Sequence, residues 1–161
     1  MTPPAAVSIR PATAKDASAV TKCLQLAFES HRGGYTPDAY RETALTPDLY
    51  RERLASMTIL VAVADKNLVV GTLAFQVIAE GEGHLRGMAV LPAWQGTGVA
   101  NELLAAAERK LRGGGCLHVS LDTTEPLTRA VRFYEKHGYR STGRVTSFFG
   151  MAVFEYAKPL T

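Results

Sequence analysis

The chain has 161 residues, 47% of them hydrophobic and 20% charged, which is the balance of one ordinary globular domain over residues 1–161. Its formal net charge of +3 is too small to indicate nucleic-acid binding and mildly favours an anionic ligand. Because no apolar run is long enough to span a bilayer and the N-terminus lacks a signal-peptide pattern, we expect a cytoplasmic protein with no membrane partner.

The N-terminal third is predicted to hold one strand and two helices. Residues 7–11 form the strand, and Thr13 with Asp16 makes a capping box where the first helix begins. That helix carries apolar residues on one face: Val20, Leu24, Ala27 and Phe28. Residues 29–46 are polar, aromatic and poorly periodic, so no regular element is expected there. A second helix is predicted to begin after Thr46, with a proline in its first turn.

The rest of the chain alternates between strands and helices. Three apolar runs of strand length are bounded by turns: 58–64, 68–80 and 83–91. The helix that follows ends at the glycines of 113–115 and has one apolar stripe: Val99, Leu103, Leu104, Ala107 and Leu111. Residues 116–123 form the next strand, and Pro126 opens a last helix that ends at Gly138. Two final strands are predicted over 140–149 and 151–158.

This order of elements predicts an α/β domain with one mixed sheet and helices on its faces. The two cysteines, Cys23 and Cys116, stand far apart in apolar settings, which favours buried free thiols over a disulfide. Neither has a neighbour at metal-ligand spacing, and we expect no metal site.

The stretch "LPAWQGTGVANELL" (91–104) places two glycines directly before a helix. Helix N-termini bind anions, and glycines let the backbone approach a pyrophosphate closely. A dinucleotide-binding fingerprint would need a third glycine where Asn101 stands, with an acid near Asp122, and a P-loop would need a lysine after Gly98. A tight turn that binds nothing is the remaining alternative.

Two stretches resemble the GNAT superfamily of N-acetyltransferases. The first, "MAVLPAWQGTGVANELL", contains the residues of the acyl-CoA signature: Val90, Pro92, Gln95, Gly98 and Ala100. The second, "AVRFYEKHGY", supplies Ala130, Phe133, Tyr134, Gly138 and Tyr139. The chain's opening "IRPATAKDASAV" and its closing "YAKPL" are also similar to family ends. The resemblance implies the GNAT fold, in which a mostly antiparallel mixed sheet is flanked by helices on both faces and its central strand pair splays apart.

The resemblance also implies a binding site for acetyl-CoA as co-substrate. Backbone amides of the loop hold the pyrophosphate: Gln95, Gly96, Thr97, Gly98, Val99, Ala100 and Asn101. The pantetheine arm pairs with the strand edge at Met88, Ala89 and Val90, where an N–H also faces the thioester carbonyl. Gly87 fits a bulge that aims these groups, or alternatively a close helix packing. Leu127 stands where many relatives have an asparagine that contacts the cofactor.

Tyr134 corresponds in the resemblance to the tyrosine that serves the departing CoA sulfur. A phenol titrates near 10 and a thiol near 8.5, so a hydrogen bond to the sulfur is sufficient and full proton transfer is uphill. The alternative is a core tyrosine on an amphipathic helix. Phe133, its neighbour, is the better core candidate.

A base must also take the proton of an amine that titrates near 10.4. Counting back from Val90 by twos puts Met88, Arg86, His84 and Glu82 on one strand face, if a bulge at Gly87 does not break the parity. His84 and Glu82 are the candidate bases, with solvated turn residues as the alternative. Arg86 stays charged and can instead bind a substrate carboxylate.

We therefore expect an acetyl-CoA-dependent N-acetyltransferase that acts on a primary amine, a small molecule or a peptide, by direct attack in a ternary complex. The cysteines have no paired histidine, which argues against a covalent acyl-enzyme. A non-catalytic acyl-CoA-binding or regulatory domain is the alternative, and a homodimer is left open. Substrate identity should reside in residues 29–44 and 146–154, which supply acids and aromatic rings: Glu29, Asp38, Glu42, Tyr35, Tyr40, Phe148 and Phe149.

Overall fold

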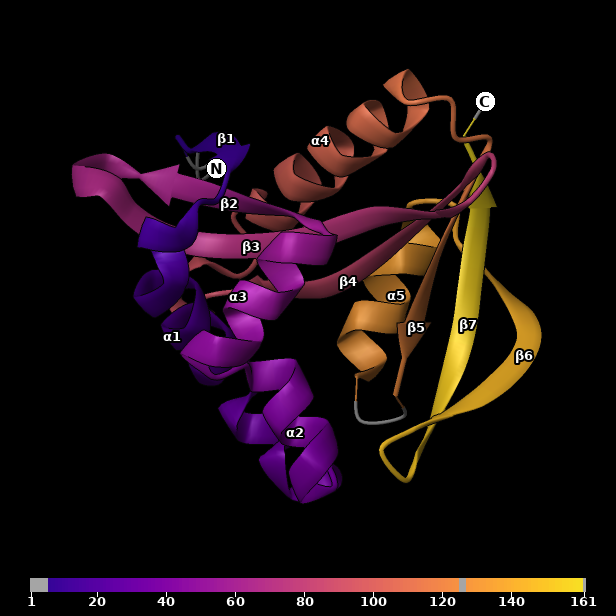
Figure 1. Cartoon of the computed structure of the whole chain (residues 1–161), viewed down its shortest axis with the longest axis horizontal. Coiled ribbons are helices and arrows are strands. Elements are labelled where there is room, and N and C mark those ends of the chain that lie inside the picture. The colour runs from indigo at the N-terminus through magenta and orange to yellow at the C-terminus, as the bar shows by residue number, and fades with distance from the viewer. Residues whose placement is uncertain (1–5, 125–126, 161) are drawn as a thin grey trace.

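The computed structural model describes residues 6–124 and 127–160. A seven-stranded sheet runs through this part of the chain (Figure 1). Its strands are β1 (Ser8–Pro11), β2 (Thr58–Ala64), β3 (Leu68–Ala79), β4 (Glu82–Val90), β5 (His118–Thr123), β6 (Arg140–Phe148) and β7 (Met151–Pro159). The α-helices are α1 (Ala17–Phe28), α2 (Pro37–Ala44), α3 (Pro47–Ser56), α4 (Val99–Gly113) and α5 (Thr128–Lys136). Short 3-10 turns are η1 (Ala14–Asp16), η2 (Glu29–Gly34), η3 (Asp65–Asn67) and η4 (Pro92–Trp94).

The strands lie in the order β1-β2-β3-β4-β5-β7-β6, and every neighbouring pair is antiparallel except β4 with β5. The predicted mixed, mostly antiparallel sheet is therefore confirmed. The parallel register of β4 with β5 runs from Glu82 opposite His118 to Leu85 opposite Leu121. Pairing with β5 ends at Leu85, whereas β4 continues to Val90, so this register favours the predicted splay of the central pair. The splay itself stays a prediction.

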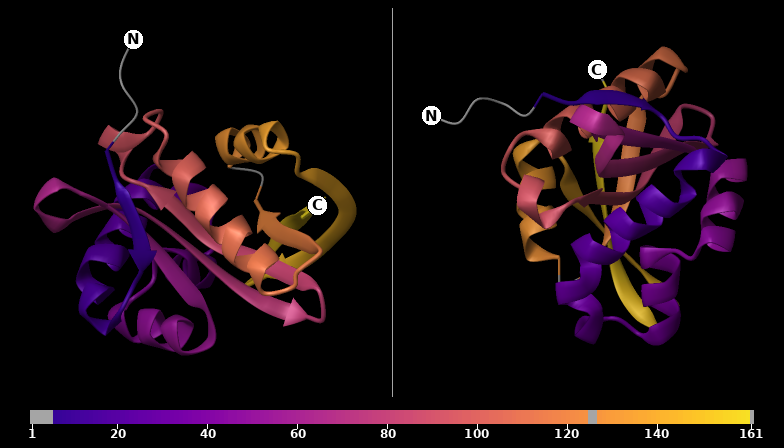
Figure 2. Two further views of the ribbon diagram at one scale, coloured as in Figure 1. Left: turned by 90° about the horizontal axis from the view of Figure 1, so that it is seen from above. Right: turned by 90° about the vertical axis from the view of Figure 1, so that its left-hand side faces the viewer.

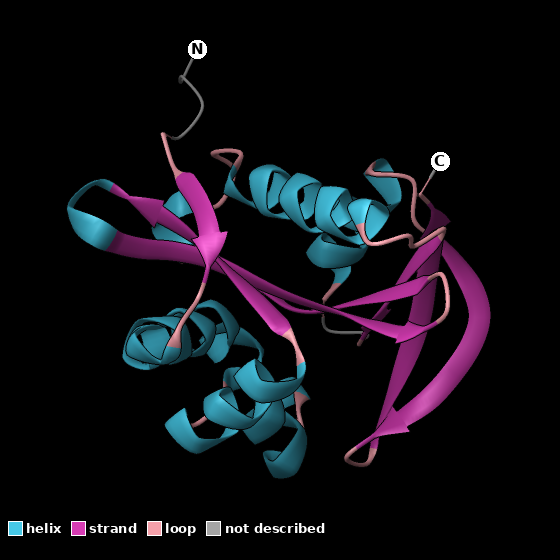
Figure 3. Cartoon of the chain, turned by 45° about the horizontal axis from the view of Figure 1, so that its top comes forward, coloured by secondary structure: helices cyan, strands magenta, loops and turns pink. Residues whose placement is uncertain are grey.

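Helices cover both faces of the sheet, as predicted. Figures 2 and 3 show α4 on one face and α1 to α3 on the other. Each face has its own apolar core: Leu103 and Leu111 belong to the α4 side, and Val20 and Leu24 to the α1 side. Helix α4 packs closely, since a Cβ added at Gly71 would lie 2.8 Å from a methyl carbon of Val99. This packing holds the start of α4 beside the end of β4.

The predicted capping box is present, although the chain first makes the 3-10 turn η1 before α1. The Thr13 N–H donates to the Asp16 carboxylate at 2.8 Å. Arg10 donates two hydrogen bonds of 2.9 Å to the same carboxylate, and this pairing lowers the pKa of Asp16 to about 2. The second predicted helix is α3, which Thr46 caps by accepting from the N–H of Leu49 at 3.3 Å.

The prediction of no regular element over residues 29–46 is wrong. The segment forms η2 and then α2, which Thr36 caps by accepting from the Ala39 N–H at 3.2 Å. The sequence contains the signal, because Thr36, Pro37 and Asp38 repeat the Thr-Pro-Asp that opens α3. The expected start of the last helix at Pro126 lies outside the described residues, and α5 is described from Thr128.

A buried carboxylate on α4 joins this helix to the C-terminal part of the sheet. Glu108 accepts from the Tyr139 hydroxyl at 2.7 Å and from the Lys158 ammonium at 2.8 Å. Replacing Glu108 with alanine should lower the free energy of unfolding by about 2–4 kcal/mol, because the buried Tyr139 hydroxyl loses its acceptor and the Lys158 ammonium keeps only the His137 carbonyl. Denaturant unfolding measures this change, and Glu52→Ala on exposed α3 surface is the matched control. Equal losses for both variants would contradict the prediction.

Candidate active site

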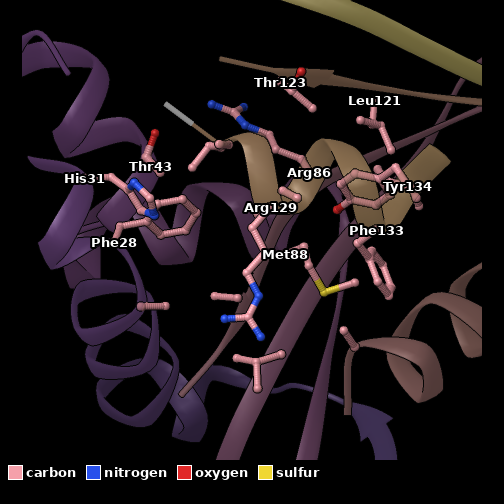
Figure 4. A pocket seen from close by; sticks show the side chains of 18 of the residues that line it. Phe28, His31, Thr43, Arg86, Met88, Leu121, Thr123, Arg129, Phe133 and Tyr134 are labelled. Carbon is pink, nitrogen blue, oxygen red and sulfur yellow. The ribbon is translucent and has the colours of Figure 1, made fainter. Parts of the chain in front are cut away.

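One large cavity opens where β4 ends and α4 begins (Figure 4). Its volume is about 1370 Å³. That exceeds the roughly 300–1,000 Å³ of pockets that hold one drug-sized ligand, so it has room for two reactants. Residues of η2, α2, β4, β5, α5 and the β6–β7 turn surround it.

The glycine loop before α4 forms one end of the cavity. Gly96 and Gly98 have φ values of +79° and +96°, and a Cβ added at either would meet no atom within 4 Å. Gly98 is the N-cap of α4 and provides no side-chain cap, so the first N–H groups of the helix lack an internal partner. These groups and the positive end of the helix dipole make this end fit an anion.

The predicted loop residues divide into two groups. Those that line the cavity are Gln95, Gly96, Gly98, Ala100 and Asn101. The side chain of Val99 instead belongs to the α4-side core, and the Thr97 hydroxyl donates to the Trp94 carbonyl. Only backbone groups of Val99 and Thr97 can therefore serve a ligand.

Gln95 connects the loop to β4 and to α5. Its side-chain amide donates to the Val90 carbonyl at 3.2 Å, and the Arg129 guanidinium donates to its amide oxygen at 3.0 Å. Arg129 thus brings a positive charge to the cavity near the start of α4, a placement that the sequence pattern did not indicate. Leu127, the N-cap residue of α5, packs against the α1-side core and offers no polar side-chain atom to a ligand.

Strand β4 contains the bulge expected at Gly87. Thr72 of β3 pairs with Ala89, and Ala74 pairs with Arg86, so two β4 residues stand opposite one β3 residue. Gly87 has a φ of +68°, which a glycine adopts without steric cost. Bulges redirect the side chains and backbone groups that follow them.

The bulge breaks the parity that put Met88, Arg86, His84 and Glu82 on one face with Val90. Ala89 and Arg86 pair with two β3 residues that share a face, so they lie on the same face of the sheet. Ala89 belongs to the α1-side core, whereas Met88 and Val90 pack on the α4 side. One extra residue in a strand moves all later side chains to the opposite face. Arg86 and His84 therefore lie on the face opposite Met88 and Val90.

Near Val90, backbone groups of β4 face the edge of the strand that points away from β3. The N–H of Leu91 donates to the Val70 carbonyl of β3 at 2.8 Å. Since successive N–H groups of a strand point to opposite edges, the N–H of Val90 points away from β3, toward the side where pairing with β5 has ended. Met88, Ala89 and Val90 all line the cavity.

Tyr134 is both a core residue and a cavity residue. Its ring packs at 5.3 Å from Phe133 and 5.5 Å from Tyr139, between ring centroids, and the residue is 6% exposed. Figure 4 shows its hydroxyl facing into the cavity from α5. Burial raises the pKa of Tyr134, so the phenol stays protonated at neutral pH and acts as a hydrogen-bond donor.

His84 lies in the cavity wall, in contact with two polar residues of β5. Its Nδ1 is 2.9 Å from the Ser120 hydroxyl, and its Nε2 is 3.7 Å from the Asp122 carboxylate. Burial lowers the pKa of His84, although the charge of Asp122 acts in the opposite direction. The lowered pKa keeps the imidazole neutral and able to accept a proton. Ser120 and Asp122 reach His84 through the parallel register of β4 with β5. Glu82 is exposed at the start of β4 and is not part of the cavity wall.

The two segments expected to set substrate identity meet at the other end of the cavity. The Thr36 hydroxyl donates to the Phe149 carbonyl at 2.7 Å. In the first segment, the Tyr35 hydroxyl also lies 3.3 Å from the hydroxyl of Thr124, which directly follows β5. The cavity wall includes five of the seven side chains predicted there: Glu29, Tyr35, Glu42, Phe148 and Phe149. Asp38 and Tyr40 lie outside it.

Both cysteines are free and buried, as expected. Burial raises the pKa of the Cys23 thiol to about 12, which suppresses the reactive thiolate. Within residues 6–124 and 127–160 no cluster of three or more His, Cys, Asp or Glu side chains is placed to hold a metal ion. In the same ranges, no helix combines the length and apolar character needed to cross a membrane.

Fold and cavity together define an α/β domain in which the start of a helix, a phenol and an imidazole share one cavity. Residues 20–139 match the acetyltransferase (GNAT) family, and the chain belongs to that family. It is 36% identical over 66 residues to an aminoglycoside N(6')-acetyltransferase type 1 of Stenotrophomonas maltophilia, covering 41% of this chain and 43% of that protein. It is 37% identical over 79 residues to an acetyltransferase of Agrobacterium fabrum, covering 49% and 56%. The chain therefore matches about half the length of these curated relatives.

Solved structures of acetyltransferases share the whole fold. A GNAT-family acetyltransferase of Staphylococcus aureus superposes with a TM-score of 0.80 at 15% identity, covering 97% of this chain and 100% of that one. A PaiA N-acetyltransferase of Thermoplasma acidophilum, solved in complex with coenzyme A, superposes with a TM-score of 0.78 at 19% identity, covering 96% and 99%. At these identities the likeness concerns the fold.

Proposed function

We propose that this protein transfers an acetyl group from acetyl-CoA to a primary amine by direct attack within a ternary complex. The observation that carries the proposal is the convergence of three groups on one cavity: the start of α4, the Tyr134 hydroxyl and His84. Its fold neighbour with bound coenzyme A adds support for the choice of co-substrate.

The glycine loop fits the pyrophosphate of acetyl-CoA. The cradle at Gly96 and Gly98 has no Cβ to obstruct it, and the N–H groups at the start of α4 point to an anion. Arg129 adds a cation on the same side of the cavity. The Val90 N–H is directed at the open strand edge, where it can donate to the thioester carbonyl as negative charge develops on that oxygen.

In the reaction, the amine nitrogen forms a bond to the carbonyl carbon and the bond from that carbon to sulfur breaks. The ammonium group loses one proton to become the attacking amine and a second proton as the amide forms; one of the two ends on the released thiolate and the other in solvent. Neutral His84 accepts the first proton, directly or through water, and the Tyr134 hydroxyl donates a hydrogen bond to the leaving sulfur. Keeping an alkyl amine unprotonated at pH 7 costs about 4.6 kcal/mol, which explains the need for a base.

The first test is release of CoA thiol from acetyl-CoA in the presence of a panel of amines, with mass spectrometry of the products. We expect thiol release that depends on the amine and is matched by one acetylated amine per thiol. A non-catalytic acyl-CoA-binding domain would instead bind acetyl-CoA in calorimetry and release no thiol with any amine. That result would contradict the proposal.

The pH dependence of kcat/KM tests His84 as the base. Activity should rise with pH as His84 loses its proton, which gives the profile a rising limb. Because burial lowers the pKa of His84, the midpoint of this limb should lie below the ordinary histidine pKa of about 6.5. His84→Ala should abolish the limb. Asp122→Asn should move it to lower pH, because the carboxylate favours the protonated imidazole.

The control for this profile is Glu82→Gln, which changes an exposed residue of the same strand and should leave the limb in place. Amines of different pKa separate the substrate's own limb from that of the enzyme. A limb that follows the amine and ignores the His84 substitution would mean that water carries the proton away.

A further inference from the structure

Two arginines from different elements meet at the end of the cavity away from the glycine loop. Arg53 of α3 is 7% exposed, and Arg86 of β4 is half-buried; both belong to the cavity wall. The Arg53 guanidinium lies over Gly87, where an added Cβ would be 2.7 Å from its nitrogen. The glycine of the bulge thus makes room for a buried cation beside Arg86.

Arg53 is held in place by the protein itself. It donates to the Glu42 backbone carbonyl at 2.9 Å. Burial and the neighbouring charge of Arg86 lower the pKa of Arg53 to about 10, so it remains charged at neutral pH. Two like charges therefore share this end of the cavity.

Arg86 lies over an aromatic ring and keeps its hydrogen-bond donors available. Its guanidinium carbon lies 5.5 Å from the centroid of the Phe148 ring. Among the residues that the structure describes, no carboxylate lies within ion-pair distance (4.0 Å) of Arg86 or Arg53. Glu42 and Asp122 act on Arg86 only at longer range. In Figure 4 the Arg86 side chain extends toward Thr43, and the Tyr134 hydroxyl faces the cavity from α5.

We propose that the acceptor is an amine that also carries a carboxylate, an amino-acid-like substrate whose carboxylate binds the planar guanidinium of Arg86. A guanidinium offers two parallel donors that match a carboxylate, and Arg86 holds its guanidinium over the Phe148 ring in the cavity wall. Arg53 increases the positive charge that draws an anion to this end. The inference rests on the proposed N-acetyltransferase function and names the class of its substrate.

The same charges disfavour polycationic acceptors. An aminoglycoside or a polyamine would bring several ammonium groups to a space bordered by two guanidinium groups. This chain should therefore differ in acceptor from its relative in Stenotrophomonas maltophilia, which is named for aminoglycosides. Acidic Glu42 and Asp122, which also line the cavity, are placed to favour a single ammonium group.

The test compares matched pairs of acceptors. L-amino acids and ω-amino acids of increasing length are each paired with their carboxamide, and spermidine and kanamycin represent polycations. The preferred amino acid should exceed its carboxamide in kcat/KM by about 10- to 100-fold, the range expected for hydrogen bonds to a charged group. Arg86→Gln should raise KM for the amino acid by the same factor and change KM for the carboxamide and for acetyl-CoA little.

Two further variants sharpen this result. Arg86→Lys keeps the charge without the planar pair of donors and should restore part of the affinity. Arg32→Gln removes an exposed arginine outside the cavity and should leave the amino-acid preference unchanged. Equal use of amino acid and carboxamide, or better use of a polycation, would overturn the inference.

A binding measurement separates this inference from the proposed function. Calorimetry with the CoA-saturated protein compares an N-acetylated amino acid with the corresponding N-acetylated carboxamide, for the wild type and for Arg86→Gln. We expect the carboxylate to bind more tightly only when Arg86 is present. If this holds but no amine is acetylated, the catalytic proposal fails and the carboxylate site stands. If amines are acetylated but binding ignores Arg86, the carboxylate site is wrong.

Discussion

Replacing Tyr134 with phenylalanine should lower kcat about 10- to 1000-fold and leave the affinity for acetyl-CoA nearly unchanged. The substitution removes only the hydroxyl that faces the cavity and retains the ring that packs on Phe133 and Tyr139. The protein should therefore fold normally. In the proposed mechanism the hydroxyl donates to the sulfur as charge develops on it, so its loss should raise the barrier without weakening the ground-state complex.

The matched control is Tyr139→Phe. This hydroxyl donates to Glu108 away from the cavity, so its removal should cost stability and leave kcat close to that of the wild type. Single-turnover kinetics ensure that chemistry is the step measured. An unchanged rate for Tyr134→Phe under those conditions would assign Tyr134 to packing alone.

Replacing Gly98 with aspartate should weaken acetyl-CoA binding about 100-fold or more, measured by calorimetry. The new carboxylate would stand where the structure offers backbone N–H groups to an anion, and it would repel a pyrophosphate there. Aspartate tolerates a positive φ better than most residues and is a good N-cap, so the fold should survive.

Two controls isolate the charge effect. Gly98→Ala introduces the backbone strain without the charge and should weaken binding much less. Gly113→Asp adds the same charge at the other end of α4 and should leave the affinity for acetyl-CoA unchanged. Tighter binding of NAD(H) than of acetyl-CoA to the wild-type protein would support the dinucleotide alternative and contradict the assignment of the loop.

Local sequence patterns were sufficient for most of the fold. Apolar runs and turn residues located the strands, and Thr13 with Asp16 located the start of the first helical segment, because these signals act between neighbours in the chain. The glycine loop could be placed directly before a helix for the same reason, since the loop and the helix start are consecutive in the chain. Helix α2 carried the same Thr-Pro-Asp signal as α3, so this element too could have been predicted from neighbouring residues.

The tertiary structure decided what surrounds the reacting groups. The bulge at Gly87 placed His84 and Arg86 on the face opposite Val90, and alternation along the strand could not determine this without the pairing to β3. Ser120 and Asp122 reach His84 only through the parallel register of β4 with β5, and Arg53 reaches Arg86 only because α3 packs over that glycine. The sequence by itself determined the family and the position of the glycine loop before a helix, and it selected Tyr134 as a candidate. Contacts between residues distant along the chain determined the partners of His84 and the meeting of the two arginines, since strand register and helix packing are properties of the whole fold.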